Sequence, residues 1–340
     1  MKKSFYIGNV PIGNGHISIQ SMTNTLTTDV EGTIKQIQEL NKAGAELVRV
    51  SVPDVESALC CKKIVDSVSV PVIADIHYSA KPALIAIENG VKKIRINPYN
   101  MSENDIRLVV NQCREYDVPI RIGVNKGSAG RSITPSELAQ DAANCAKRIE
   151  DYGWDKLVIA VKSSDVRETV LAYRELYKIT DYPLHVGLTE SGTENSGMIK
   201  SAVAIGSLLL DGIGDTIRVS LATNPVKEVY AAKKILRSIG LDKNYVEVIA
   251  CPTCARTCIE VEKIAAEIEE MTRDYAIPLK VAVMGCTVNG IGESKGADVG
   301  IAGGKHKSIL FHGGEQETVS NDEIKTRLIG IIEEYINNDK

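Results

Sequence analysis

The 340-residue chain is poor in aromatic side chains, which make up 4% of it and include one Trp and two Phe. Proteins that bind single-stranded nucleic acid stack bases on aromatic side chains, so this composition argues against that class. Neither charge is in large excess, because 40 basic residues stand against 44 acidic ones for a net charge of −4. The chain therefore has no electrostatic footprint for DNA or a membrane surface, and any anion site must be local.

Long apolar runs are missing as well. No stretch of about 18 apolar residues occurs, so no membrane-spanning helix is predicted. The first three residues, Met1, Lys2 and Lys3, could open a signal peptide, but residues 4–15 contain polar residues and glycines instead of an apolar stretch. We therefore expect a cytoplasmic protein, in which the eight cysteines need an explanation without disulfides, since a reducing compartment favours metal ligation or catalysis.

The positions of the cysteines indicate two domains. Four cysteines are scattered through helical patterns and are expected to pack as small apolar side chains: Cys60, Cys61, Cys113 and Cys145. The other four fall in the last quarter of the sequence: Cys251, Cys254, Cys258 and Cys286. This asymmetry predicts one domain at 1–242 and a second at 243–340, with the boundary near 241–245.

Short β-branched runs alternate with longer amphipathic stretches through the first 240 residues, which is typical of repeated βα units and a parallel sheet. Strands are predicted at 17–21, 47–50, 72–75, 93–96, 120–123, 157–161, 184–187 and 216–219. Helices are predicted at 33–43, 55–65, 81–88, 104–116, 136–152, 165–178, 198–210 and 225–239. Eight such units indicate the α/β class and a (β/α)8, or TIM, barrel.

Cationic residues stand at or just beyond the ends of five predicted strands. They are Arg49, Arg95, Arg121, Lys162 and Arg218. Barrel active sites lie where these strand ends converge, and one carboxylate such as Glu190 cannot neutralise five cations. A diphosphate suits such a site, because a guanidinium grips two phosphate oxygens at once, and the loop 125–131 could add backbone amides. The alternative is that carboxylates around the barrel rim pair with these cations.

Two strand ends carry candidate groups for proton transfer. His77 lies beside Asp75 at the third strand end, and Glu190 lies at the seventh. A hydrogen-bonded rim histidine and a salt-bridged glutamate are the structural alternatives. Lys162 could instead form a Schiff base, which would make the chain an aldolase-like barrel enzyme with a zinc-stabilised tail.

The cysteine spacing in the last quarter of the sequence predicts a thiolate centre. A strand at 246–250 leads into Cys251 and Cys254, followed by a helix to about residue 275, and a strand at 279–284 leads into Cys286. Such spacing is strong evidence for a metal or iron-sulfur site. A second C-x-x-C knuckle, which zinc ribbons usually have, is absent. Two residues remain candidates for the fourth ligand. Cys258 would lie on the same helix face as Cys251 if the helix ran through both residues, and Glu293 lies in a glycine-rich loop.

The tail of the sequence predicts strands at 309–312 and 318–319 and a helix from 321 to about 335, so this domain is α/β as well.

Taken together, these motifs resemble the family of bacterial 4-hydroxy-3-methylbut-2-enyl diphosphate synthases. The matching motifs are GNVPIG at 8–13, QSMTNT at 20–25, VRVSVP at 48–53, ADIH at 74–77, RINP at 95–98, RIGVN at 121–125, GDTIRVSL at 214–221, CPTC at 251–254 and GCTVNG at 285–290. They run in order through nearly the whole chain, which a single short motif would not do.

The resemblance implies an oxidoreductase of the methylerythritol phosphate route to isoprenoids. It would open 2-C-methyl-D-erythritol 2,4-cyclodiphosphate reductively, with flavodoxin or ferredoxin as electron donor, as a homodimer in which the cluster domain of one subunit covers the barrel of the other. A 4Fe-4S cluster would be held by Cys251, Cys254, Cys286 and Glu293. The barrel residues implied for the diphosphate are Arg49, Arg95, Arg121, Asn125, Lys162, Arg218 and Ser220, with His77 nearby. Glu190 would deliver a proton and Asn289 would orient the substrate. Cys258 is outside the family's pattern.

Overall fold

A computed structural model describes residues 2–294 and 296–338, without the side chains of Asn289, Ile291 and Glu293. Contacts divide the chain into two compact units, Met1–Ile239 and Gly240–Lys340, each of which is described here by itself. Among the described residues, every helix is too short or too polar to cross a lipid bilayer.

Eight parallel strands form the sheet of the first unit. They are β3 (Ser18–Met22), β4 (Leu47–Val52), β5 (Val72–Ile76), β6 (Lys93–Ile96), β7 (Ile120–Asn125), β8 (Leu157–Lys162), β9 (His185–Val186) and β10 (Thr216–Ile217). The hydrogen-bonded order is β8-β7-β6-β5-β4-β3-β10-β9, and a bridge between Ile159 and Leu184 joins the two ends. The predicted (β/α)8 barrel is therefore confirmed.

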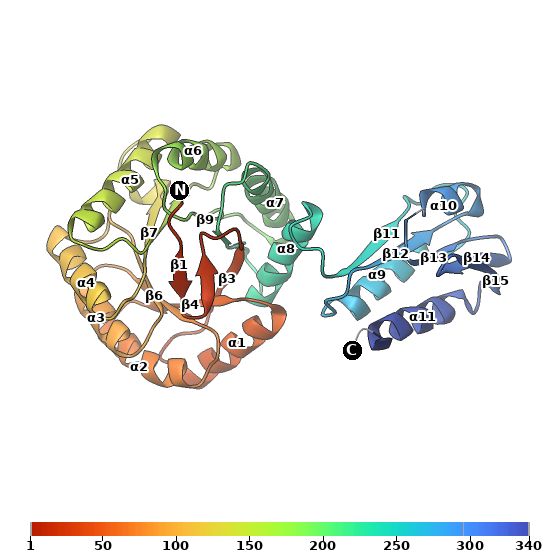
Figure 1. Ribbon diagram of the computed structural model, residues 1–340, viewed down its shortest axis with the longest axis horizontal. Coiled ribbons are helices and arrows are strands. Elements are labelled where there is room, and N and C mark those ends of the chain that lie inside the picture. The colour runs from red at the N-terminus through yellow and green to blue at the C-terminus, as the bar shows by residue number, and fades with distance from the viewer. Residues whose placement is uncertain (1, 295, 339–340) are drawn as a thin grey trace. The chain divides into compact units, whose positions relative to one another are not determined.

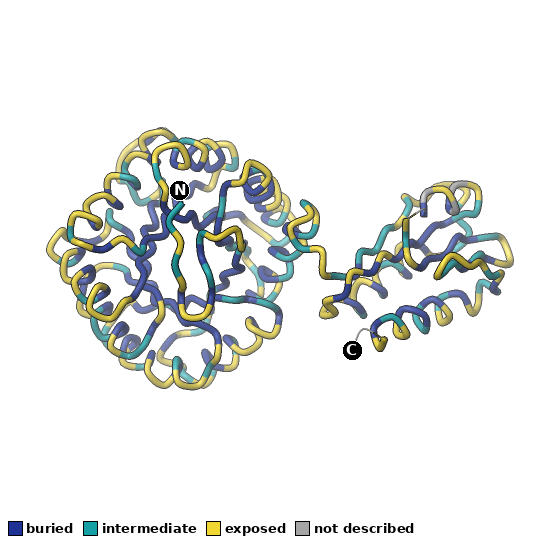
Figure 2. Tube along the Cα trace, in the orientation of Figure 1, coloured by how far each residue is buried: buried dark blue, intermediate teal, exposed yellow. Residues whose placement is uncertain are grey.

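Helices surround the barrel as an outer ring (Figure 1). They are α1 (Val30–Ala43), α2 (Val55–Asp66), α3 (Ala80–Glu88), α4 (Glu103–Glu115), α5 (Pro135–Asp151), α6 (Val166–Ile179), α7 (Glu194–Leu210) and α8 (Pro225–Ser238). Several begin at a polar residue whose side chain accepts a backbone hydrogen bond, as Asp54, Ser102 and Asp165 do. Their apolar stripes face the strands, so buried and exposed positions alternate along each helix in Figure 2.

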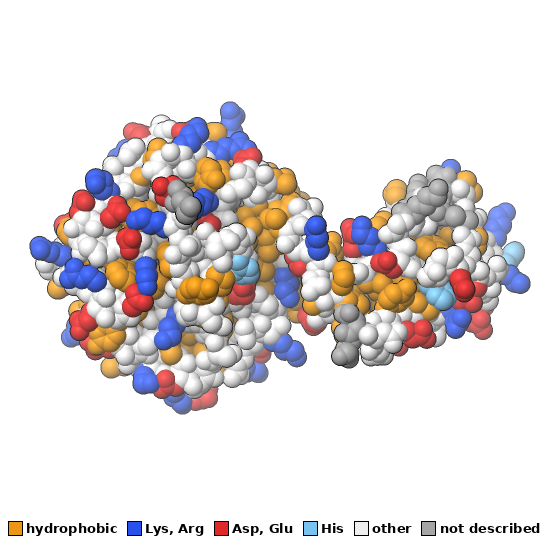
Figure 3. Space-filling model, in the orientation of Figure 1, with side chains coloured by type: hydrophobic (Ala, Val, Ile, Leu, Met, Phe, Trp, Pro, Cys, Tyr) orange, Lys and Arg blue, Asp and Glu red, His pale blue; other side chains and the backbone are white. Residues whose placement is uncertain are grey.

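An amino-terminal hairpin closes the bottom of the barrel. Its strands, β1 (Phe5–Ile7) and β2 (Val10–Ile12), lie in the segment 4–15, for which the sequence predicted no strand. Ile7, Val10 and Ile12 pack against Leu47 and other residues at the amino ends of the barrel strands. A short hairpin with alternating apolar residues gives little periodic signal, so its burial is visible only once the barrel beneath it exists. Figure 3 shows this face, with acidic and basic side chains interspersed around its rim.

Strands β9 and β10 are two residues each, shorter than the predicted 184–187 and 216–219. A Cβ placed on Gly187 would lie 2.4 Å from the carbonyl oxygen of Arg218 and 2.9 Å from Nζ of Lys162. The backbone segments at Gly187 and Arg218 approach each other too closely there for a residue with a side chain to stand at position 187. Gly187 thus brings the end of β10 and Lys162 together at the barrel mouth.

The second unit is a five-stranded mixed sheet with helices on both faces. Its strands are β11 (Val246–Ala250), β12 (Leu279–Met284), β13 (Val299–Ala302), β14 (Lys307–His312) and β15 (Glu315–Ser320), in that order, the first three parallel and the rest antiparallel. Helices α9 (Val261–Thr272) and α11 (Ile324–Asn338) cover one face with their isoleucines. Helix α10 (Thr287–Glu293) lies on the other face, where Gly290 approaches Ala302 and Met284.

Two sequence expectations for this unit are wrong, and one strand was missed. Residues 251–258 form a loop, so Cys251 and Cys258 do not share the face of a helix that continues through them, and α9 begins only at Val261. The segment expected to be a glycine-rich loop is helical at α10, since Gly290 supplies the small residue that lets this helix pack closely on the sheet. Strand β13 was not predicted, although its four residues are fully buried between two neighbours.

Candidate active site

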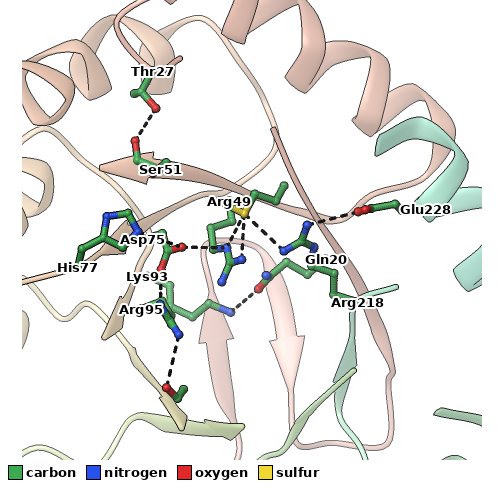
Figure 4. Close-up of polar contacts among 12 residues, drawn as sticks. Gln20, Thr27, Arg49, Ser51, Asp75, His77, Lys93, Arg95, Arg218 and Glu228 are labelled. Carbon is green, nitrogen blue, oxygen red and sulfur yellow. Dashed lines mark hydrogen bonds and ion pairs between the residues drawn. The ribbon is translucent and has the colours of Figure 1, made fainter. Parts of the chain in front are cut away.

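Five cationic side chains gather at the carboxyl ends of the barrel strands. Arg49 lies on β4, Arg95 on β6, Arg121 on β7, Lys162 at the end of β8 and Arg218 directly after β10. Each of the first four is at most 9% exposed. Their charges lie close enough to act on one another, since all four guanidiniums lower the pKa of Lys162 in addition to burial. Figure 4 shows Arg49 and Arg218 approaching the same sulfur atom, with Asp75 between Arg49 and Arg95.

Two buried carboxylates pair with three of these cations. Asp75 on β5 lies 3.1 Å from Nη1 of Arg95 and 3.7 Å from Nε of Arg49. Glu228 on α8 lies 3.5 Å from Nη2 of Arg218 and also accepts the backbone N–H of Leu221 at 2.8 Å. The alternative of rim carboxylates is thus partly correct. The pairing groups are Asp75 and Glu228, and within the described residues Glu190 makes no ion pair with these cations.

Donors remain unpartnered after this pairing. Among the described residues, Arg121 has buried Nε and Nη1 atoms without a hydrogen-bond partner, and the Nε atoms of Arg95 and Arg218 are in the same state. No carboxylate lies within ion-pair distance of Arg121 or Lys162 in the described part of the chain. Buried donors left unsatisfied are costly, so several of them at one place indicate an anionic ligand.

The charges of this cluster shift its pKa values in a consistent way. Burial alone would raise the pKa of Asp75, but the guanidiniums of Arg49 and Arg95 outweigh burial and lower it to about 2. Burial lowers the pKa of Arg49 to about 9, against the opposing effect of Asp75. Asp75 is therefore ionised at neutral pH and serves as a fixed counter-ion, so it is not a proton donor there.

Met22, at the end of β3, connects two of the guanidiniums. Its sulfur accepts from Nε and Nη2 of Arg49 at 3.1 and 2.9 Å and from Nη1 of Arg218 at 3.4 Å. No role was predicted for Met22, because a thioether carries no charge that would mark it as part of an anion site. Glu228 was missed as well, since nothing in the sequence of α8 links it to a strand end.

The remaining predicted barrel residues surround this cluster. His77 follows β5, is partly exposed, and places Nε2 3.9 Å from Asp75. Asn125 ends β7 opposite Lys162 on β8, and half-buried Ser220 follows Arg218. The loop after β7 forms a single 3-10 turn, Lys126–Ser128, whose lysine pairs with Glu168.

Glu190 differs from these residues in its backbone. It is exposed and has φ +53°, a left-handed conformation that only one other described non-glycine residue, Asp117, adopts. Holding a side chain there costs on the order of 1 kcal/mol. Such strain is typical of positions that must present a functional group.

In the second unit, the cysteines follow two adjacent parallel strands. Cys251 comes directly after β11 and Cys286 soon after β12. These two strands pair in parallel, with Ala250 opposite Val283. The peptide of Gly285 links the loops: its N–H donates to Sγ of Cys251 at 3.1 Å, and its carbonyl accepts the N–H of Cys258 at 2.8 Å. A hydrogen bond from the N–H of Arg256 lowers the pKa of the exposed Cys254.

The four thiols of this unit do not form a metal-binding group among the described residues. All four cysteines of this unit are free, and among the described residues no three His, Cys, Asp or Glu side chains are close enough together to hold a metal ion. The backbone of α10 carries positions 289 and 293, but the side chains of Asn289 and Glu293 lie outside the described residues. Cys258 donates its thiol hydrogen to the carbonyl of Arg256 at 3.3 Å.

The fold and the site define a class, a (β/α)8-barrel protein with a buried cluster of cationic side chains at its strand ends, followed by a smaller α/β unit with cysteines at its strand ends. The family within that class follows from comparison. Residues 2–233 match the GcpE TIM-barrel domain and residues 247–334 match the GcpE protein C-terminal domain. The chain belongs to the GcpE family.

Curated relatives match along almost the full chain. A protein of Clostridium perfringens named 4-hydroxy-3-methylbut-2-en-1-yl diphosphate synthase (flavodoxin) is 47% identical over 337 residues, covering 96% of this chain and 97% of the relative. Proteins with the same name from Brevibacillus brevis and Thermotoga maritima are 44% and 46% identical, over 99% and 96% of this chain and 97% and 96% of their own lengths.

Two solved structures match about 71% of this chain. Dihydropteroate synthase from Xanthomonas albilineans superposes with a TM-score of 0.53 at 14% identity, covering 71% of this chain and 99% of its own. The Yersinia pestis enzyme of the same name gives 0.53 at 12% identity, over 71% of this chain and 100% of its own. At this identity the likeness concerns the fold only.

Proposed function

We propose that this chain is an iron-sulfur oxidoreductase that reductively opens 2-C-methyl-D-erythritol 2,4-cyclodiphosphate to (E)-4-hydroxy-3-methylbut-2-enyl diphosphate in isoprenoid precursor biosynthesis. The reaction consumes two electrons and two protons and releases water. One observation carries the proposal: a barrel mouth with buried, unpartnered guanidinium donors in a chain whose full length matches synthases of this product.

The barrel residues bind the diphosphate. The unpartnered nitrogens of Arg121 and the amine of Lys162 face the anion without a competing carboxylate, whereas Arg49 and Arg95 are held in place by Asp75. A guanidinium fixed in this way binds phosphate oxygens with little further loss of side-chain freedom. Asn125 and Ser220 supply neutral hydrogen-bonding groups at the same strand ends.

Glu190 is the proton donor that lets a hydroxyl group leave as water. Its exposed carboxyl group stands on a strained backbone at the barrel mouth, where a substrate held by the cations would reach it. His77, anchored near Asp75, holds a second exchangeable proton beside the diphosphate. Asn289, whose side chain lies outside the described residues, would orient the substrate.

The residues of the second unit fit an iron-sulfur cluster. Cysteine sulfur is the donor such clusters take, and the Gly285 N–H already points at Sγ of Cys251, as backbone donors do toward cluster sulfurs. Cys251, Cys254, Cys286 and Glu293 would hold a 4Fe-4S cluster, with the carboxylate as the one hard ligand. When bound, the cluster supplies the two electrons.

The relatives' names support the proposal for the electron donor. We propose flavodoxin as the electron donor, as the relatives' names print it, with ferredoxin as the alternative. We further propose a cytoplasmic homodimer in which the 243–340 domain of one subunit serves the 1–242 domain of the other. Light scattering of the intact chain tests the dimer, and reduction by each donor protein in turn tests the electron source.

The decisive experiment begins with protein purified without oxygen. About four irons and four sulfides per chain, together with conversion of the cyclic diphosphate under a strong reductant, would support the proposal. Cys60→Ser, on helix α2 of the barrel unit, is the matched control and should leave both measurements unchanged. A chain that holds one zinc and no sulfide after anaerobic reconstitution would contradict it.

A further inference from the structure

Lys93 is a buried lysine for which the proposed reaction has no use. It lies on β6 two residues before Arg95, so both side chains point into the barrel and Lys93 lies one layer deeper. It is 0% exposed. Its Nζ donates to Oε1 of Gln20 at 3.1 Å, the contact drawn in Figure 4.

The surroundings of Lys93 offer no counter-charge. The charged and titratable groups inside the barrel are Arg49 on β4, Asp75 on β5, Arg95 on β6 itself, Arg121 on β7, Lys162 on β8, His185 on β9 and Arg218 after β10, with Tyr173 of α6 behind them. Asp75 is engaged by Arg49 and Arg95. In the described part of the chain, no carboxylate comes within 4 Å of Nζ of Lys93.

A charged ammonium in this place would be unstable. Burial lowers the pKa of Lys93 well below its ordinary value, and Arg121 and Arg49 lower it further. An unpaired buried cation costs several kcal/mol, whereas a neutral amine donating to Gln20 costs far less. His185 is held neutral by the same burial and cations. The arginines keep their charge because the guanidinium is intrinsically far more basic.

We propose that Lys93 is a neutral amine in the free enzyme and takes up one proton from solvent when the diphosphate binds above it. The lone pair of Nζ accepts the proton, and no other bond changes. The anion adds negative charge next to Arg49 and Arg121, and so offsets the repulsion that keeps Lys93 neutral. This inference rests on the proposed function, because it needs the diphosphate at the barrel mouth.

Titration calorimetry of the full chain with the cyclic diphosphate, without reductant, tests this proposal. Each phosphorus of that ligand carries one strongly acidic oxygen, so the ligand takes up no proton at neutral or mildly alkaline pH. Heats in buffers of different ionisation enthalpy give the number of protons taken up. We expect net uptake in the wild type and an affinity that falls about tenfold per pH unit for each proton.

Two substitutions separate the outcomes. Lys93→Met should bind the ligand with about one proton less, while Lys92→Met, at the exposed neighbouring position, should leave the uptake unchanged. Binding by the wild type without proton uptake, or equal uptake by Lys93→Met, would overturn the role of Lys93 and leave the proposed function intact. No binding of the cyclic diphosphate by the wild type would overturn both.

Discussion

The barrel mouth and the cysteine loops are built in opposite ways. At the mouth, rigid parallel strands hold the cations, and Asp75, Glu228 and Met22 fix three of them before any ligand arrives. In the second unit the thiols stand on loops after β11 and β12. Among the described residues, no three metal-ligating side chains lie close enough together there to hold a metal ion. The cationic site is preorganised by its own side chains, whereas the proposed cluster site would be completed by the group that it holds.

The difference follows from the energetics of each ligand. Ordering the side chains of a site on binding would reduce the affinity for an anion, so the cationic cluster is best formed before the anion binds. Internal carboxylates stabilise the buried cations of such a preformed cluster. A metal centre contributes its own binding free energy to ordering the loops that hold it. The barrel should therefore tolerate loss of the cluster, and the cluster loops should tolerate loss of the barrel charges.

Cys286→Ser should have the largest effect. Removal of one proposed thiolate ligand should abolish turnover and remove most iron and sulfide, since a cluster bound by two thiolates is unstable. Binding of the cyclic diphosphate, measured by calorimetry, should survive within a few-fold if the barrel alone binds it. Loss of that binding would show that the two sites are coupled and would break the comparison.

Glu190→Gln should lower kcat by roughly 10²–10⁴, the range expected for one general acid, with KM almost unchanged. Iron content and substrate affinity should equal those of the wild type. Steady-state kinetics with a fixed artificial reductant measures both constants. Normal turnover would mean that another group, with His77 as the first candidate, supplies the proton.

Arg121→Met should raise the dissociation constant of the cyclic diphosphate by roughly 10²-fold, because a buried charge-assisted contact is worth on the order of 3 kcal/mol. The iron content should stay the same. Arg131→Met, which changes an exposed guanidinium paired with Asp141 outside the cluster, is the matched control. Equal effects of the two substitutions would remove Arg121 from the site.

Much of the barrel could be read from the sequence because its signal is local. Parallel strands buried on both faces appear as short β-branched runs, and helices have a different period. The five cations could be placed at one end because all strands run in the same direction. Strand β6 was predicted with its observed bounds, and most others within two residues.

What the sequence could not reveal depends on packing between distant elements. Glu228 reaches Arg218 only because α8 packs beside β3, and the hairpin of β1 and β2 is buried only by the barrel under it. Lys93 carries no sign in the sequence that it is fully buried. The strained backbone of Glu190 is likewise set by its loop, although the residue itself was predicted as functional.

Glu228→Gln should have a moderate effect, raising KM for the cyclic diphosphate by roughly tenfold with little change in kcat. The amide oxygen can still accept the Leu221 N–H, but Arg218 loses its anionic anchor. Glu228→Ala should in addition lower the free energy of unfolding by about 1–3 kcal/mol, because a backbone donor is left unsatisfied. Chemical denaturation separates the two variants. Equal KM values for wild type and both variants would show that Arg218 needs no positioning.

Cys258→Ser should have the smallest effect. The backbone N–H of Cys258, which binds the Gly285 carbonyl, survives the substitution, and the serine hydroxyl can still donate to the Arg256 carbonyl. Iron, sulfide and kcat should therefore remain within about twofold of the wild type, because only the backbone of this residue shapes the loop. A loss of iron similar to that of Cys286→Ser would instead make Cys258 a ligand in place of Glu293. Since a fourth thiolate is softer than a carboxylate, it would also close the position that the proposed reaction needs open.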